Sequence, residues 1–402
     1  MSNAEGEVSI LAPWQLFERG CDITPLSLAT PRPDFQGALI QFLIGLAQTT
    51  MPPGDEDAWV EGLHTPFDAA HVKSRFGSVS RAFNLCGDSH RFMQDLDCAD
   101  GRKQPIDTLI IGMPGENTLK QNSDLFQKRA SVHHLCPTCA AMAIMTLQFN
   151  GPPGGAGHRT GLRGGGPLSC VVIGKTLTET IWLNVLPEDE FHLGFSGEQK
   201  STLSDIFPWM GPLRTSEDGT KTGISDVSQL QQFWGMGRRL LLDCDNPVEG
   251  TCDICGITTQ TAIASLKTKT YGISYDGSWR HVLTPYYRSG EDVLPVHVQS
   301  GGITYRHWLG VVQNDPDNGR EVARVVQRFR NIHADLFGLL PAMPQLWAFG
   351  YDLDNVKAKC WYDNYMPLIE VSDTIRADYE VSIAQIVRAA QQVNDILHGC
   401  VK

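Results

Sequence analysis

Four cysteines have the spacing of metal ligands. Cys136 and Cys139 enclose Pro-Thr, and Cys252 and Cys255 enclose Asp-Ile. Two thiolates on such a C-x-x-C turn point at one metal ion, and two turns complete a tetrahedral zinc site. We therefore expect one structural zinc ion that joins two distant parts of the chain. The alternative is a redox dithiol at Cys136 and Cys139, placed at a helix N-terminus whose dipole lowers a thiol pKa.

A glycine-rich loop follows the first cysteine pair. The segment GPPGGAGHRTGLRGGGP spans residues 151–167 and includes Arg159 and Arg163. Glycine has no Cβ, so such a loop adopts positive φ angles and lets another backbone approach closely. The two arginines favour an anionic partner, such as a nucleic acid. The alternative is a surface loop without a ligand.

Further basic residues flank the two cysteine pairs. Lys120, Lys128 and Arg129 precede the first pair, and Lys267 and Lys269 follow the second. If a metal joins the pairs, these side chains converge on a patch that suits a sugar-phosphate backbone or a narrow groove. The net charge of -12 argues against a general coating of nucleic acid, so contacts to phosphate must be local.

No convincing set of acid, base and nucleophile is present. The sequence lacks the zinc-protease, serine-hydrolase and kinase motifs, and Gly174-Lys175-Thr176 lacks the first glycine of a phosphate loop. We interpret His133 and His134 as ordinary polar residues beside four thiol ligands. These observations favour a protein that is not an enzyme. The alternative function is a zinc-stapled or dithiol enzyme that acts on a small anionic substrate at the glycine loop.

The elements that must position these residues form an irregular mixture. We expect helices at 38–48, 138–149 and 320–339, and strands at 106–113, 169–173, 180–186 and 270–275. No repeat is present. The N-terminus lacks the features of a signal peptide, which predicts a cytoplasmic protein with reduced thiols, and no apolar run is long enough to span a membrane. The seven cysteines outside the two pairs are expected to be buried apolar residues.

The last segment is a predicted amphipathic helix. Its apolar residues recur every three or four positions from about 371 to 397, and Gly399 follows as a stop signal. The predicted stripe consists of Ile375, Tyr379, Ile383, Ile386, Val387, Ala390, Val393 and Leu397. A single helix cannot bury such a stripe, so it must pack on the body, on a partner or on further helices.

Several of these motifs together resemble the CasA family, the large subunit of the type I-E CRISPR surveillance complex called Cascade. They are GLRGGGP, both cysteine pairs, SHRFMQ at 89–94 and LKTK at 266–269, and the resemblance extends from Trp14 to Tyr351. It implies an α+β fold with a large irregular N-terminal domain at 1–365. The remaining segment, 366–402, would be the first helix of a C-terminal four-helix bundle.

The resemblance also implies a function and partners. CasA recognises the protospacer-adjacent motif of double-stranded target DNA through the minor groove, promotes duplex opening and R-loop formation, and recruits a helicase-nuclease. Guide RNA and the other Cascade subunits would be partners, and no membrane is involved. A purely structural subunit is a third possibility.

The family's site residues transfer to this chain one by one. The glycine loop that enters the groove is similar to Gly154, Gly155, Ala156 and Gly157, with Arg159 beside it. The lysine that reaches into the groove is similar to Lys269. The wedge that splits the duplex is a glutamine after a Gly-Tyr pair, and here the position is Asn355, with Val356 next to it. A loop near the guide-RNA end, which carries an aromatic side chain, is similar to 117–129 with Phe126.

Overall fold

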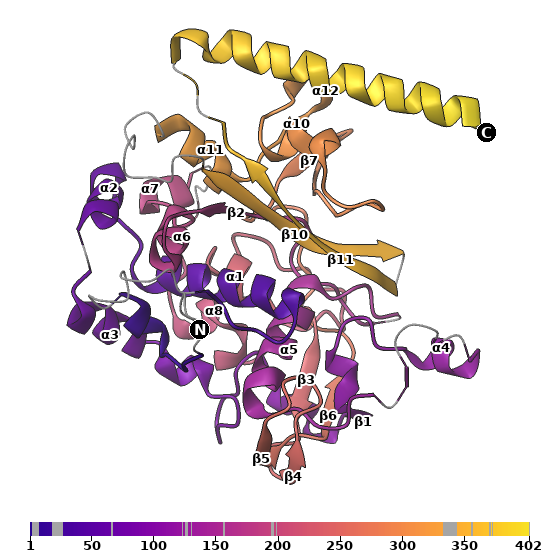
Figure 1. Ribbon diagram of the computed structural model, residues 1–402. Coiled ribbons are helices and arrows are strands. Elements are labelled where there is room, and N and C mark those ends of the chain that lie inside the picture. The colour runs from indigo at the N-terminus through magenta and orange to yellow at the C-terminus, as the bar shows by residue number, and fades with distance from the viewer. Residues whose placement is uncertain are drawn as a thin grey trace.

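The computed structural model describes most of the chain. The described residues are 1, 8–17, 27–65, 67–122, 124, 128–129, 131–155, 157–193, 197, 199–332, 344–354, 357–369, 371 and 373–401. Figure 1 shows a body of mixed helices and strands with a long C-terminal helix along its top. This α+β architecture confirms the predicted fold class.

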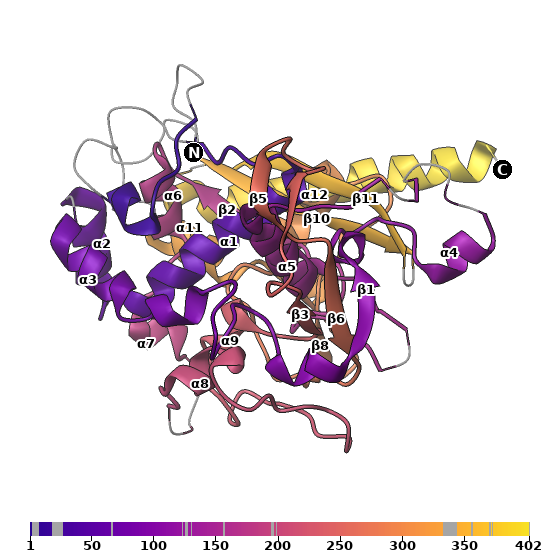
Figure 2. The same ribbon diagram turned by 90° about the horizontal axis from the view of Figure 1, so that it is seen from below.

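Helices are distributed through the body and along its top (Figure 1). The α-helices are α1 (Pro33–Thr50), α2 (Glu56–His64), α3 (Ala69–Gly77), α4 (Glu116–Lys120), α5 (Pro137–Asn150), α6 (Leu177–Leu183), α7 (Glu188–Phe191), α8 (Leu203–Ile206), α9 (Gln231–Trp234), α10 (Trp308–Val311), α11 (Arg324–Ile332) and α12 (Asp373–Val401). Figures 1 and 2 place α2 and α3 on one side of the body and α4 on the opposite side.

Helices α1 and α5 form the centre of the core and pack on each other. Both begin with proline at the first helical position, where the missing amide costs no hydrogen bond. Both bury most of their circumference, which agrees with their nearly continuous apolar sequences. The predictions of helices at 38–48 and 138–149 are therefore confirmed, with α1 starting five residues earlier.

The strands form small antiparallel sheets. They are β1 (Arg102–Pro105), β2 (Ser169–Ile173), β3 (Arg239–Leu242), β4 (Val248–Thr251), β5 (Thr258–Ala262), β6 (Ser265–Lys269), β7 (Tyr286–Ser289), β8 (Asp292–Pro295), β9 (Arg320–Glu321), β10 (Gln345–Asp354) and β11 (Lys357–Pro367). The strand orders are β1-β6-β3, β11-β10-β2, β4-β5 and β8-β7-β9. The first and third of these sheets position the candidate site.

Three of the strand predictions were wrong. Residues 106–113 form a 3-10 helix (Ile106–Leu109) and a turn, because Ile106 and Leu109 are buried on one side at the spacing of three that a 3-10 turn provides. Residues 180–186 fall largely in α6, whose N-cap Thr176 accepts a hydrogen bond from the Glu179 amide. Residues 270–275 are irregular, since β6 ends at Lys269 and Tyr271 has a φ of 61°.

Two other predictions were closer to the structure. The strand at 169–173 is confirmed as β2, a buried edge strand that pairs with β10. The helix expected at 320–339 is shorter, because Arg320 and Glu321 form β9 and α11 spans Arg324–Ile332. Positions 333–339 of that prediction lie outside the described residues.

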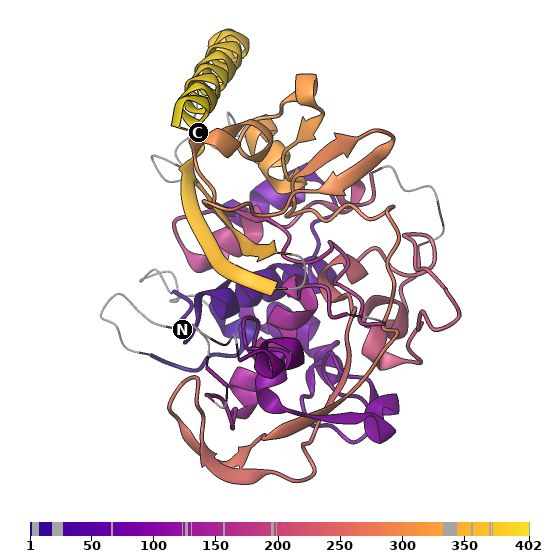
Figure 3. The ribbon, with the colours of Figure 1, turned by 90° about the vertical axis from the view of Figure 1, so that its right-hand side faces the viewer.

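Helix α12 contacts the body through a small apolar cluster. Ala384 and Val387 form a small apolar cluster with Leu309, separate from the main core. Figure 3 shows α12 at one end of the molecule, with the β4-β5 hairpin at the opposite end. The predicted stripe is divided, since Ile383 and Val387 face the body while Ile386 and others are exposed. The helix continues through Gly399, so that residue is not a stop.

The cysteines outside the two pairs behave in three ways. Cys86 and Cys244 form a disulfide, which contradicts the expectation of buried single thiols. Cys98 and Cys170 are buried as predicted, whereas Cys360 and Cys400 are exposed because β11 and the end of α12 lie at the surface. Cys21 lies outside the described residues.

None of the helices that the structure describes is both long enough and apolar enough to cross a membrane.

Candidate metal centre and nucleic-acid interface

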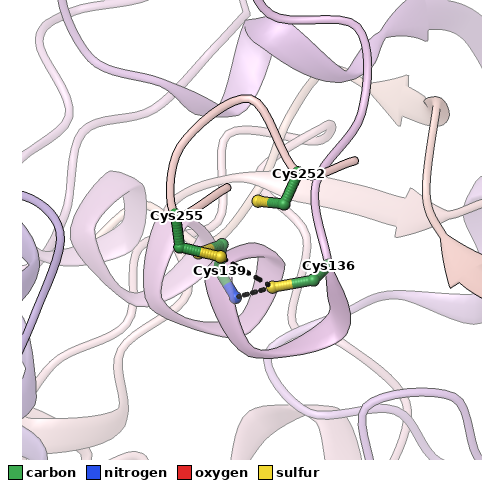
Figure 4. Close-up of side chains that lie close together, drawn as sticks. All are labelled: Cys136, Cys139, Cys252 and Cys255. Carbon is green, nitrogen blue, oxygen red and sulfur yellow. Dashed lines mark hydrogen bonds between the residues drawn. The ribbon is translucent and has the colours of Figure 1, made fainter. Parts of the chain in front are cut away.

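The first cysteine pair lies at the N-terminus of α5. Cys136 is the N-cap residue, and its Sγ accepts a hydrogen bond from the Cys139 amide at 3.4 Å. The second pair lies in the turn between β4 and β5, where Gly256 follows Cys255 with a φ of 76°. The helix N-terminus and the tight turn both favour thiolates, because free backbone amides point toward the sulfur atoms. Figure 4 shows the four side chains converging between these two segments.

Backbone contacts hold the two pairs together. Leu135 and Ile263 form an antiparallel bridge with N···O distances of 3.0 and 2.8 Å. The Asp253 carboxylate, between the second pair of cysteines, accepts hydrogen bonds from the His133 and His134 amides at 2.6 and 2.8 Å. These contacts bring the sulfur atoms of the two cysteine pairs together, although the pairs are far apart in the sequence.

The sulfur geometry suits a tetrahedral metal ion. All four Sγ atoms lie within 4.8 Å of one another, and those of Cys136 and Cys255 are 3.7 Å apart. A zinc ion with Zn–S bonds of about 2.3 Å places its sulfur ligands about 3.8 Å from each other. Within the part of the chain that the structure describes, these four residues form the one group found with this ligand geometry. The cluster can therefore hold a metal.

Burial and hydrogen bonds set the protonation of these thiols. Burial and neighbouring thiols raise the pKa of Cys139. Burial also raises the pKa of Cys136, and the hydrogen bond from the Cys139 amide only partly opposes this increase. At Cys252, burial raises the pKa, but amides of Cys136, Cys255 and Ile254 outweigh it and lower the value to about 7. A reactive dithiol needs an accessible thiolate with a depressed pKa. Buried Cys139 does not meet this requirement, so the arrangement favours metal binding over redox chemistry.

The glycine loop leaves the C-terminus of α5, and its residues 153–155 are exposed. Gly155 has a φ of 82° and is exposed, with open space where a Cβ would stand. Gly157 has a φ of 79°, and its missing Cβ leaves room for Thr270. A Cβ on Gly154 would collide with the tip of the Arg238 side chain and with Cβ of His158. Ala156 lies outside the described residues.

The loop is attached to the end of β6, where Lys269 is located. The amide of Tyr271, two residues after Lys269, donates to the Gly157 carbonyl oxygen at 2.6 Å. Arg159 donates to Ser216 Oγ at 2.9 Å, and Ser216 Oγ donates in turn to the Gly272 carbonyl oxygen. The structure therefore brings together the predicted site residues of the loop and of β6.

A surface cavity of about 700 Å³ adjoins this junction. It is lined by Asp97, Asp100, Gly101, Arg102, Glu217, Arg239, Thr268, Lys269, Thr270 and Tyr271. Sequence reasoning missed the acidic residues and Tyr271, because no spacing in the sequence relates 97–100 or 217 to the end of β6. A positive φ at a non-glycine residue such as Tyr271 is uncommon and is not visible in the sequence.

Other predicted residues do not join the site. Arg163 is buried and donates to Gln41, Ser169 and Thr284, so it supports the core and does not contact a ligand; burial lowers its pKa to about 10. Arg129 is bound to Asp124 through hydrogen bonds and an ion pair of 2.6 Å. Phe126, Asn355 and Val356 lie outside the described residues.

Solved structures of CRISPR-associated proteins share this fold. Thermus thermophilus CasA (Cse1) matches with a TM-score of 0.70 and 16% identity, over 97% of this chain and 78% of that one. Cse1 from Acidimicrobium ferrooxidans matches with a TM-score of 0.66 and 16% identity, over 97% and 74%. A chain of a structure described as a CRISPR RNA-guided surveillance complex gives 0.69 and 18%, over 97% and 78%. These matches show that the chain has the fold of those structures.

The family follows from the sequence itself. The family described as CRISPR-associated protein Cse1 matches residues 1–402, so this chain belongs to the Cse1 family. The resemblance to CasA is confirmed, since the two names denote one family in the solved structures.

Proposed function

We propose that this chain is the large, non-catalytic subunit of a type I-E CRISPR surveillance complex. In this role it recognises the protospacer-adjacent motif of double-stranded DNA through the minor groove, promotes duplex opening and R-loop formation, and recruits a helicase-nuclease. The observation that carries the proposal is the hydrogen bond from the Tyr271 amide to Gly157, because it joins the glycine loop to the strand that ends at Lys269.

The loop and the lysine are suited to a narrow groove. Gly155 offers exposed backbone without a side chain, so a DNA strand can approach it to contact distance. Lys269 supplies an ammonium group that can donate to adenine N3 and thymine O2 at the floor of the minor groove. Since minor-groove readout is degenerate, several related motifs should be tolerated. Sequence-specific pairing is left to the guide RNA, which agrees with the net charge of -12.

Further residues complete the proposed roles. Gly154, Ala156 and Gly157 shape the loop, and Arg159 lies beside it through its bond to Ser216. We assign the wedge that separates the first base pair to Asn355, assisted by Val356, and contact near the guide-RNA end to Phe126.

Zinc is the ion that we propose for the cluster of Cys136, Cys139, Cys252 and Cys255, because a site of four thiolates is typical of structural zinc.

The partners of the complete assembly are target DNA, guide RNA, the other Cascade subunits and the helicase-nuclease, and we place this function in the cytoplasm.

A charge introduced at Gly155 tests the proposal. Gly155→Asp places a carboxylate where the loop meets DNA phosphates, and we expect motif-dependent binding by the assembled complex to weaken at least tenfold. Gly290→Asp is the matched control, because Gly290 also has a positive φ and open space around its missing Cβ but lies in the β7-β8 turn. Electrophoretic mobility shifts on duplexes with and without the motif provide the measurement. Equal losses for both variants would refute the assignment of the loop.

A further inference from the structure

Lys269 is already paired in the protein without DNA. Its Nζ lies 2.5 Å from Oδ1 of Asp100, the last residue of the 3-10 helix η4 (Leu96–Asp100). The other lysine of the same motif, Lys267, donates to the carbonyl oxygen of Ala99. Both lysines of the LKTK segment therefore bind the C-terminal end of one short helix.

The backbone fixes Asp100 in this position. Gly101 follows it and donates to the Cys98 carbonyl oxygen at 2.8 Å. A Cβ on Gly101 would lie 2.7 Å from the Thr268 carbonyl oxygen, so only glycine lets η4 approach β6 this closely. Arg102 then pairs with Thr268 in the β1-β6 register. Asp100 is held beside Lys269 by the sheet itself and not by a flexible loop.

The pair lies at an accessible cavity whose lining carries both signs of charge. The Asp100 side chain is 80% exposed, whereas that of Lys269 is 31% exposed. Asp97 and Glu217 line the same cavity, and Arg239 at its base is paired with Asp95 at 2.6 Å. Arg102 is an exposed cation on the same lining, and the carboxylate is the more exposed partner of the Asp100–Lys269 pair.

We propose that Asp100 is a positioning residue that holds Lys269 at the cavity until motif DNA displaces the carboxylate. This inference rests on the proposed function of Lys269 as the residue that enters the minor groove. An exposed ion pair is weak, because water and salt screen its attraction, so a groove with several well-placed acceptors can replace the carboxylate. Single phosphates on unrelated DNA compete with Asp100 less well, because they offer charge alone and are screened by salt. Binding of motif DNA must therefore break the Asp100–Lys269 pair, whereas binding of other DNA leaves it in place.

Removal of the Asp100 charge tests this proposal in the assembled complex with its guide RNA. The wild-type complex first selects its motif from duplexes randomised beside the guide-matched region. Binding is then measured for a duplex with the selected motif and for one with the motif scrambled. We expect Asp100→Asn to tighten binding of the motif duplex by about threefold to fivefold, because the pair no longer has to be broken, and that of the scrambled duplex by less than about twofold.

Asp97→Asn is the matched control. It removes the same charge from the same cavity but leaves the Lys269 pair intact, so both duplexes should change by the same small factor. Asp100→Glu should keep the discrimination of the wild type. In a Lys269→Ala background, Asp100→Asn should have no further effect on discrimination, because Asp100 acts through that lysine.

The outcomes separate the two hypotheses. A wild-type complex that enriches no motif refutes the proposed function. A wild-type complex that selects a motif, together with equal effects of Asp100→Asn and Asp97→Asn, overturns the inference about Asp100. The inference is also overturned if Asp100→Asn still changes discrimination in the Lys269→Ala background, or if it weakens motif binding, which would mean that Asp100 orients the lysine toward the groove.

Discussion

The four cysteine sulfurs act as a set, because each pair alone cannot complete a metal site. Cys136 takes its position from the start of α5, and Cys252 from the end of β4. Asp253 joins the two segments through the His133 and His134 amides. A bound ion would hold these elements together from the centre of that junction, and it would also support the glycine loop that leaves the other end of α5.

Loss of one thiol should therefore remove the metal and destabilise the chain. We expect Cys255→Ser to reduce zinc from about one ion per chain to a small fraction, and to lower the free energy of unfolding by more than about 2 kcal/mol. Elemental analysis and thermal unfolding measure the two effects.

Cys360→Ser is the control for this variant, because Cys360 is a free and exposed thiol outside the cluster. It should retain both metal and stability. A wild-type chain that contains no metal and has a disulfide between Cys136 and Cys139 would instead support the redox interpretation.

At the scale of elements, α12 is attached to the body by a small apolar cluster and by ion pairs. Ala384 and Val387, with Ile383 beside them, pack on Leu309 and Trp308. Arg388 lies 2.9 Å from both Asp315 and Asp317, and Glu380 pairs with Arg330. We propose that the domain boundary predicted at 365/366 lies a few residues later, because β11 runs to Pro367 and Met366 and Leu368 belong to the main core, whereas the apolar contacts of α12 form a separate cluster.

A charge at the buried anchor should release α12 without unfolding the body. In Val387→Asp, burial of an unpaired carboxylate against Leu309 costs several kcal/mol, so the helix should detach. Limited proteolysis should then cut ahead of α12 and leave the body intact.

The neighbouring substitution Ile386→Asp is the control, since Ile386 lies on the same helix but is 63% exposed. It should leave the proteolysis pattern unchanged. If both variants are cut equally, the contact with Leu309 does not hold the helix.

At the scale of the whole molecule, a disulfide and the cluster of four cysteines connect segments that are distant in the sequence. The Cys86–Cys244 disulfide joins positions 158 residues apart, and Arg91 pairs with Asp245 next to it at 3.0 Å. Cys244 lies between β3 and the hairpin that carries the second pair of the metal centre. Disulfides are rare in the cytosol, so this pair should be reduced where we place the protein.

Oxidation should raise the stability of the purified chain. Closing a loop of this length restricts the unfolded state by about 5 kcal/mol in the chain-entropy description, so the oxidised protein should unfold at a higher temperature than the reduced one. Calorimetry with zinc held constant measures the difference. Cys86→Ser should abolish it, whereas Cys400→Ser, an exposed free thiol, should preserve it. A difference that survives in Cys86→Ser would have to come from another thiol.

The sequence by itself determined the local parts of this protein. The spacing of the cysteines, the glycines after α5 and the apolar runs of α1, α5 and α12 depend on neighbours a few residues away, and the motifs were sufficient to indicate the family. Short apolar segments such as 106–113 and 180–186 were misassigned, because burial selects apolar residues in helices and strands alike.

Only the tertiary structure decided which charged groups are available. Arg163 and Lys269 are both basic residues near motifs, yet one is buried against Gln41 and the other lies at an open cavity beside Asp100. The physical reason is that a charge finds its partner through space. The path of the chain brings η4 to β6 and Cys86 to Cys244, and no local spacing encodes either encounter.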